Sequence, residues 1–165
     1  MSYIDFENLP VYQKARTFRN RIYELVKKLP AFEEYNLKLQ MRKAATSLTN
    51  NIAEGNGRYY YQENIHFCRR SRGSLNELID DLNLCLDQKY ETEQYLLGLK
   101  KEASEVRKEI NKYIAYLQRC LKESQVSNTE LGLWFPISDE VSSRMVNWIK
   151  TTNCHQNGSI KPKPV

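Results

Sequence analysis

The residues best suited to metal chemistry in this sequence are few and widely separated. Glu63 and His66 have the Glu-x-x-His spacing found in di-iron helical bundles. Such a site needs the motif on two helices together with two further glutamates. The other histidine, His155, lies near the C-terminal end of the chain. We therefore expect no metal site and no cofactor.

The cysteines do not form a pattern typical of a metal or redox site. Cys68, Cys85, Cys120 and Cys154 are far apart and include no Cys-x-x-Cys pair. The sequence also has no Ser/His/Asp set, no Walker loop and no glycine-rich phosphate turn. We expect buried thiols and no enzymatic activity, and a metabolic enzyme is only a third alternative to the two functions considered below.

Basic and aromatic residues around the second interhelical connection are the strongest functional signal. The basic members of this group are Arg42, Lys43, Arg58, Arg69, Arg70 and Arg72. Tyr59, Tyr60 and Tyr61 lie beside them. Cationic side chains neutralise phosphates and aromatic rings stack on bases, so the combination predicts a nucleic-acid interface. The alternative is that the tyrosines pack at a subunit contact while the arginines pair with Glu54, Glu63 or acids of a neighbouring subunit.

A second basic group lies on the first expected helix, and its members are Arg16, Arg19, Lys27 and Lys28. Between residues 11 and 29 a single acid, Glu24, faces six basic residues, so we predict that this group also contacts nucleic acid. A third group, between residues 100 and 112, is accompanied by Glu102, Glu105 and Glu109. A solvated helix face explains that last group better.

The overall charge is compatible with a polyanionic partner but does not require one. The net charge is +5 and the isoelectric point is near 9.0. Residues 76–95 hold six acidic residues against one lysine, Lys89. We therefore expect a surface with a basic side and an acidic side.

Four apolar stripes with helical spacing predict four long helices, at residues 10–29, 36–55, 61–89 and 92–121. Short links force sequential helices to be antiparallel, and stripes of similar length bury one another only as a bundle. The predicted fold is an all-α, antiparallel, up-down-up-down four-helix bundle. It occupies residues 1–124, and residues 125–165 form a partly disordered C-terminal extension with a short helix.

Several local features refine this prediction. Asn8 is the expected cap of the first helix, with Pro10 in its first turn. Gly55 and Gly57 suit a left-handed cap at the end of the second helix, and Gly73 inside the third helix suggests a tight packing contact.

The sequence contains no run of about 20 apolar residues of the kind that a membrane span requires. Its first residues include Asp5 and Glu7, where a signal peptide has a basic start and an apolar stretch. We expect a cytoplasmic protein that does not contact a membrane.

Two segments resemble a known family. Residues 40–58, with an Asn-Ile-Ala-Glu-Gly core at residues 51–55, and residues 72–78 are similar to a bacterial four-helix-bundle family encoded by intervening sequences in large-subunit ribosomal RNA genes. Phe6, Leu9, Val11, Tyr12 and Ala15 are similar to the start of that family. The resemblance spans about residues 6–121. Thr49 stands where many members have proline, and the region after residue 124 is longer than in most members.

The family includes the accessory variability determinant proteins of diversity-generating retroelements. The resemblance implies a homopentameric ring and, in the retroelement members, a basic surface that binds nucleic acid and associates with a reverse transcriptase. The resulting hypothesis is an oligomeric accessory protein whose partners are itself, RNA or DNA, and a reverse transcriptase. The alternative is a protein-interaction ring or scaffold that binds an acidic protein partner and no nucleic acid.

Overall fold

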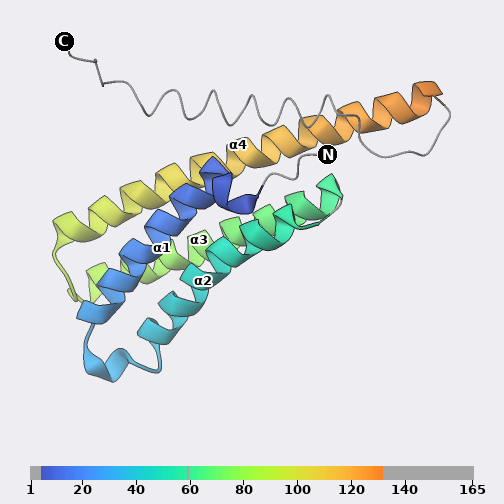
Figure 1. Cartoon of the computed structure of the whole chain (residues 1–165). Coiled ribbons are helices and arrows are strands. Elements are labelled where there is room, and N and C mark those ends of the chain that lie inside the picture. The colour runs from blue at the N-terminus through green and yellow to red at the C-terminus, as the bar shows by residue number, and fades with distance from the viewer. Residues whose placement is uncertain (1–4, 59, 132–165) are drawn as a thin grey trace, which may run out of the picture.

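The structure, a computed structural model, describes residues 5–58 and 60–131 of the chain, with side chains to residue 125. The long helices are α1 (Pro10–Lys28), α2 (Leu37–Asn56), α3 (Tyr61–Asp87) and α4 (Glu93–Leu131), joined by short links (Figure 1). Each helix packs on its neighbours in sequence, and α1 also packs on α4, which closes the bundle. The predicted all-α four-helix bundle is confirmed.

Helix ends follow local signals, with one shift at the start of α1. Pro10 is the first helical residue, where its missing N–H costs no hydrogen bond, and the capping position falls on Leu9 rather than Asn8. The helix ends before the extended Leu29, which precedes Pro30. α2 begins directly after Asn36.

The expected left-handed cap of α2 is wrong. α2 continues through Gly55 to Asn56, and Gly57 has a right-handed conformation with φ of −73°. The expected packing contact at Gly73 is also wrong, because a Cβ atom at this exposed position would meet nothing within 4 Å. Gly73 faces outward from α3, whereas Gly55 faces its neighbour.

The core is continuous and contains the three cysteines of the described region. Cys68, Cys85 and Cys120 are buried and free, which confirms the expectation of buried thiols at these positions. Burial raises the pKa of both Cys68 and Cys85 to about 12, so these thiols remain protonated and unreactive at neutral pH. Cys154 lies outside the described residues.

The contact between α2 and α3 is close and partly polar. Ser71 Oγ donates to the carbonyl oxygen of Leu48 at 2.7 Å, and the hydroxyls of Ser47 and Ser74 are 2.8 Å apart. Near the end of α2, a Cβ atom on Gly55 would lie 2.8 Å from an Asn64 oxygen and 2.9 Å from the Phe67 Cβ. The glycine of the Asn-Ile-Ala-Glu-Gly segment is therefore a steric requirement of this helix pair.

α4 is longer than its apolar stripe predicts. It passes through residue 124 without a break and continues to Leu131, so the expected boundary between residues 124 and 125 falls inside a helix. The division into a bundle domain and an extension stays a prediction. The short helix expected in the extension lies outside the described residues.

The contrast between Gly55 and Gly73 gives a direct test of this packing. We expect Gly55→Ala to lower the free energy of unfolding by about 1–3 kcal/mol, because the added methyl forces α2 and α3 apart. We expect Gly73→Ala to raise it by up to about 1 kcal/mol, since the site is open and alanine favours helix. Urea unfolding of both variants measures the difference, and equal stabilities would contradict the close contact.

Candidate nucleic-acid interface

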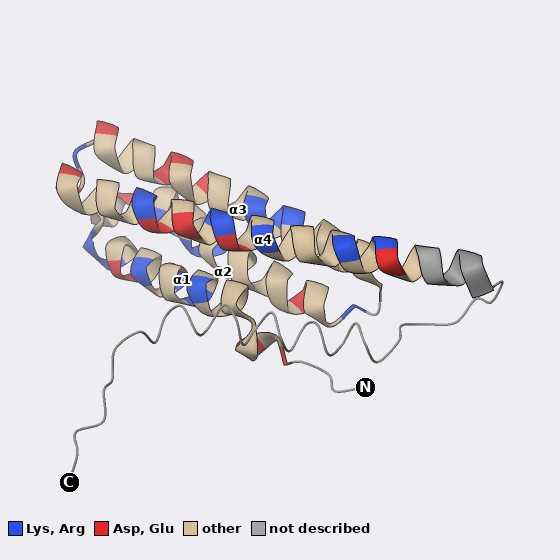
Figure 2. Ribbon diagram, turned by 90° about the horizontal axis from the view of Figure 1, so that it is seen from above, with Lys and Arg blue, Asp and Glu red and all other residues tan. Residues whose placement is uncertain are grey.

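The charge of α3 changes sign along its length (Figure 2). Its first half carries Arg69, Arg70 and Arg72, and its second half carries Glu77, Asp80, Asp81 and Asp87. Because α2 is antiparallel to α3, the C-terminal end of α2 lies beside the basic half and its N-terminal end lies beside the acidic half. The two-sided surface expected from residues 11–29 and 76–95 stays a prediction, and Lys28 of the first segment pairs with Glu91 of the second.

Two arginines from different segments meet at one aromatic ring. The guanidinium carbon of Arg58, just after α2, lies 5.0 Å from the centroid of the Phe67 ring. The guanidinium carbon of Arg70, on α3, lies 5.5 Å from the same centroid. We call these three residues the Phe67 cluster. The distances are typical of cation–π contacts, which favour a defined position for each guanidinium group.

The arginines in and beside the Phe67 cluster differ in their other contacts. Arg58 also forms an ion pair with Glu54, one helical turn earlier, which is a pairing that the alternative to a nucleic-acid interface expects. Arg72 donates to Asn111 of α4 at 2.9 Å. Arg69 is exposed and has no hydrogen-bond or ion-pair partner among the residues that the structure describes. Arg69 and Arg70 are therefore the arginines best placed to accept an external anion.

Arg42 and Lys43 do not join the Phe67 cluster. At a rise of about 1.5 Å per residue, Arg42 lies about 21 Å from the C-terminal end of α2. Its guanidinium pairs with the carboxylate of Glu34, whose pKa this hydrogen bond lowers. Lys43 lines a groove next to the acidic half of α3. The six basic residues that the sequence groups together are thus spread along the α2–α3 pair, with Arg42 and Lys43 outside the Phe67 cluster.

The basic group on α1 is partly paired, both within α1 and with other elements. Lys27 pairs with Glu24 at 2.8 Å, and Lys28 pairs with Glu91 at 3.0 Å. Arg19 Nη1 donates to the hydroxyl of buried Thr49 on α2 at 3.1 Å. The two partners outside α1, Glu91 and Thr49, were missed because a count of charges within one helix omits residues on other elements.

Arg16 differs from the other members of the α1 group. It is exposed and has no ion-pair partner within the described part of the chain. Arg16 lies on α1, whereas the Phe67 cluster is built from α3 and the residue that follows α2. The role of the α1 group in binding nucleic acid remains a prediction.

The tyrosines at the α2–α3 connection have different environments. Tyr60 is 62% exposed, whereas Tyr61 is half-buried against the core. Burial raises the pKa of Tyr61 to about 12, and the Cys120 thiol contributes to the shift. Tyr59 lies outside the described residues. Only Tyr60 of the described pair therefore presents most of its ring to solvent.

Phe67 is the residue of this surface that sequence reasoning missed. Three consecutive tyrosines nearby are a more conspicuous aromatic signal in the sequence than this single ring. One signal was available, since Phe67 precedes Arg70 by three residues and helical neighbours at this spacing share a face. The contribution of Arg58 was not visible in the spacing, because it depends on how α2 packs against α3.

The basic group on α4 is paired with nearby residues, as the sequence predicts, but Glu109 is buried rather than solvated. Lys108 pairs with Glu105 at 2.7 Å, and Lys112 pairs with Glu109 at 2.9 Å. Arg107 donates to Asn76 of α3 at 3.0 Å. This face supplies matched cationic controls for the arginines near Phe67.

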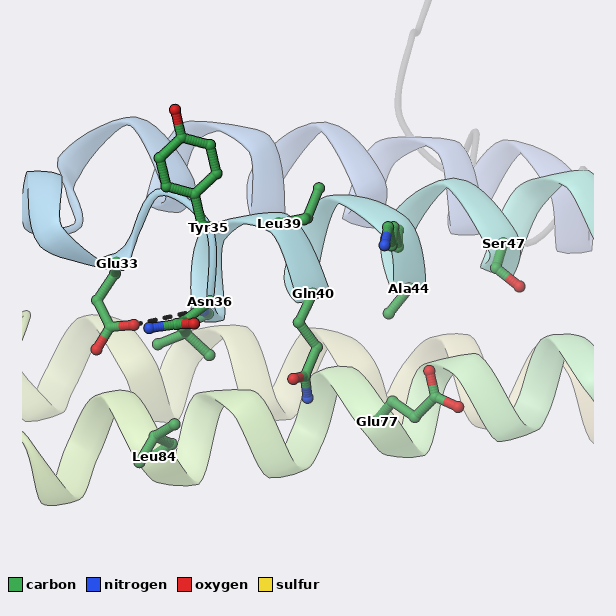
Figure 3. Close-up of a pocket in the computed structure, with 11 residues that line it drawn as sticks. Glu33, Tyr35, Asn36, Leu39, Gln40, Ala44, Ser47, Glu77 and Leu84 are labelled. Atoms are coloured by element: carbon green, nitrogen blue, oxygen red, sulfur yellow. Dashed lines mark hydrogen bonds between the residues drawn. The ribbon is translucent and has the colours of Figure 1, made fainter.

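A groove of about 680 Å³ lies between the start of α2 and the acidic half of α3 (Figure 3). Gln40 points from α2 toward α3, and Glu77 lies on the facing side. Apolar Leu39 and Leu84 also line the groove, and Leu84 is 41% exposed. The groove combines acidic and apolar groups and differs from the basic surface near Phe67.

Asp81 lies buried beside Gln40 and is 2% exposed. Its Oδ1 accepts a hydrogen bond from Gln40 Nε2 at 2.8 Å, and its Oδ2 has no partner among the described residues. Burial raises the pKa of Asp81 to about 6, and the charges of Asp80 and Glu77 add to this shift. Sequence reasoning counted Asp81 as a surface acid, whereas the structure places it between α2 and α3.

Glu63 and His66 lie one turn apart near the start of α3, and both are exposed. Within residues 5–58 and 60–131, no group of three or more metal-ligating side chains is close enough to hold an ion. No helix in this described part is both long and apolar enough to cross a membrane.

These features define a helical-bundle protein with a basic surface at one end of its α2–α3 pair. Residues 7–112 match the protein family described as 23S rRNA-intervening sequence protein, and the chain belongs to this family. Comparison with curated proteins gives no match. Membership confirms the resemblance noted in the sequence and connects the chain to nucleic acid at a coarse level.

The raised pKa of Asp81 predicts a pH-dependent stability. A carboxyl whose pKa is higher in the folded state stabilises the fold when protonated, and this contribution is lost as pH rises from about 4 through about 6. We expect Asp81→Asn to be roughly 2 kcal/mol more stable than the parent chain at pH 8, with little gain at about pH 4.

Urea unfolding across this pH range measures the effect of Asp81→Asn. Asp87→Asn is the matched control, because Asp87 is exposed on the same helix and its replacement shifts stability by less than about 0.5 kcal/mol. An equal gain from Asp81→Asn at both pH values would contradict the assignment.

Proposed function

We propose that this chain is an oligomeric nucleic-acid-binding accessory protein whose main contact surface is the basic end of the α2–α3 pair. The observation that carries the proposal is the convergence of Arg58 and Arg70 on Phe67, with unpaired Arg69 alongside. Two guanidinium groups at one half-buried ring, with Arg69 on the same helix, create a local positive field in which Glu54 and Glu63 are the nearby acids in sequence. A polyanion with regularly spaced phosphates is the ligand that matches this field.

Binding of this kind is mainly electrostatic. Each phosphate neutralised by an arginine releases bound counterions, so affinity falls steeply with salt and depends little on sequence. A single surface with so few cations binds weakly, whereas several copies on one oligomer bind a long strand together. The homopentamer implied by the family resemblance would supply this multiplicity.

The same resemblance suggests the biological setting. A retroelement accessory factor associates with a reverse transcriptase and its template RNA or cDNA. The separation of charge along α3 supports two different contacts, because the basic half suits nucleic acid and the acidic half suits a protein surface. One molecule can then hold a nucleic acid and a protein partner at opposite ends of the bundle.

A protein-interaction ring without nucleic-acid binding is the second candidate. Exposed apolar side chains at the other end of the bundle favour it, because Phe32 is 71% exposed and Tyr35 is 87% exposed. Aromatic residues are enriched at protein contacts relative to the rest of the surface. In this alternative the basic end binds an acidic protein rather than nucleic acid.

The triple variant Arg58→Gln, Arg69→Gln, Arg70→Gln tests the first proposal. We expect it to weaken binding to single-stranded RNA and to reduce the slope of log affinity against log salt by about 2, because about 0.7 counterion is released per phosphate contact. Fluorescence anisotropy with a labelled strand across a salt series measures both quantities.

The matched control is Arg107→Gln, Lys108→Gln, Lys112→Gln, which removes the same charge from α4, where these side chains already have partners. We expect a much smaller change in slope for this control. Equal slopes for the two triple variants would show that net charge alone governs binding, and no binding by the parent chain at low salt would favour the protein-interaction ring.

The oligomer is tested by the mass of the protein in solution. A homopentamer has five times the 19.5 kDa mass of the chain, and light scattering after size-exclusion chromatography distinguishes it from a monomer. A stable monomer at micromolar concentration would remove the avidity on which the proposal depends.

A further inference from the structure

The Phe67 cluster has a geometry that plain charge neutralisation does not require. A backbone-binding patch needs only separated cations, whereas here the guanidinium groups of Arg58 and Arg70 lie over one ring at 5.0 and 5.5 Å. His66 adds an edge-on contact to the same ring, with centroids 6.2 Å apart. The result is a small platform of flat groups around a half-buried aromatic residue.

The platform is held in place by the close packing of α2 and α3. The backbone of Gly55 is so near Phe67 that a Cβ atom at Gly55 would lie 2.9 Å from the Phe67 Cβ. This contact fixes the base of the Phe67 side chain, and the ion pair with Glu54 restrains Arg58. Phe67 and Arg58 are therefore positioned before any ligand arrives, which lowers the entropy cost of binding.

Arg70 is the member most available to a ligand. It is exposed, and its guanidinium has no carboxylate partner in the part of the chain that the structure describes. A guanidinium held over an aromatic ring presents N–H groups to a phosphate and a flat face to a base. Both chemistries occur together in one ligand, a nucleotide.

We propose that the Phe67 cluster binds an unpaired nucleotide of a single-stranded nucleic acid, with the base stacked on the platform and the adjacent phosphate bound by Arg70 and Arg58. This inference rests on the proposed function and narrows it from nucleic acid in general to single strands. The half-buried ring lies against α2 and cannot enter a base-pair stack. A base must therefore leave its own stack to lie on the guanidinium groups over the ring, which is easy only in unpaired segments.

The experiment uses the full chain and a short single-stranded DNA containing one 2-aminopurine, whose fluorescence falls when the base stacks. We expect binding of the parent chain to quench this fluorescence, and we expect Phe67→Leu to abolish the quenching and weaken single-strand binding about tenfold. Binding to a duplex of the same length should change less than twofold. Phe32→Leu is the matched control, because Phe32 is an exposed ring near the opposite end of the bundle.

A second variant separates the effect of stacking from that of charge. It remains informative even if replacing half-buried Phe67 destabilises the fold. Arg70→Lys keeps the positive charge of an exposed residue and removes its planar group. We expect it to reduce the quenching and the preference for single strands while leaving the salt slope unchanged. A merely electrostatic role for Arg70 would leave all three quantities unchanged and would overturn the inference.

Two further outcomes would overturn the inference while leaving the proposed function in place. One is equal affinity of the parent chain for the normal strand and for an abasic strand of the same length. The other is undiminished quenching in the Phe67→Leu variant. Failure of the proposed function has a different result, namely no salt-sensitive binding of any nucleic acid by the parent chain.

Discussion

The close approach of α2 and α3 at Gly55 is the contact on which the candidate site depends. It brings the backbone of α2 against Asn64 and Phe67, at a distance that leaves no room for a larger side chain at Gly55. Because the contact lies at the end of α2, it places Arg58 over the Phe67 ring of the next helix. The basic surface therefore depends on the same contact that packs α2 against α3.

The antiparallel arrangement of α2 and α3 also determines how charge is distributed. Residues that are near in sequence, such as Arg42 and Arg58, separate to opposite ends of the helix pair, because a helix rises about 1.5 Å per residue. Arg42 then pairs with Glu34, while Arg58 reaches Phe67. The length of α2 thus separates two surfaces, one at Arg42 and one at Arg58. Of these two, the surface at Arg58 combines cations with an aromatic ring.

The sequence was sufficient to predict the helices and their order, because apolar periodicity is a local property that each helix carries by itself. It was insufficient where the outcome depends on which helix lies opposite. Lys28 pairs with Glu91 and Arg21 pairs with Glu102, and both acids are far along the chain from their partners. The same limit explains why the glycine at position 73 was assigned a contact and the role of Phe67 was missed.

Asp81 in the acidic half of α3 is buried and contributes to the contact with α2 rather than to the charged surface. One of its carboxylate oxygens lacks a partner in the described region, so the ionised form is disfavoured between α2 and α3. Serine hydroxyls at Ser47 and Ser74 occupy the middle of the same interface. The contact between these helices is therefore closest near Gly55 and polar toward Asp81, and the close end is the one that places Arg58 over the Phe67 ring.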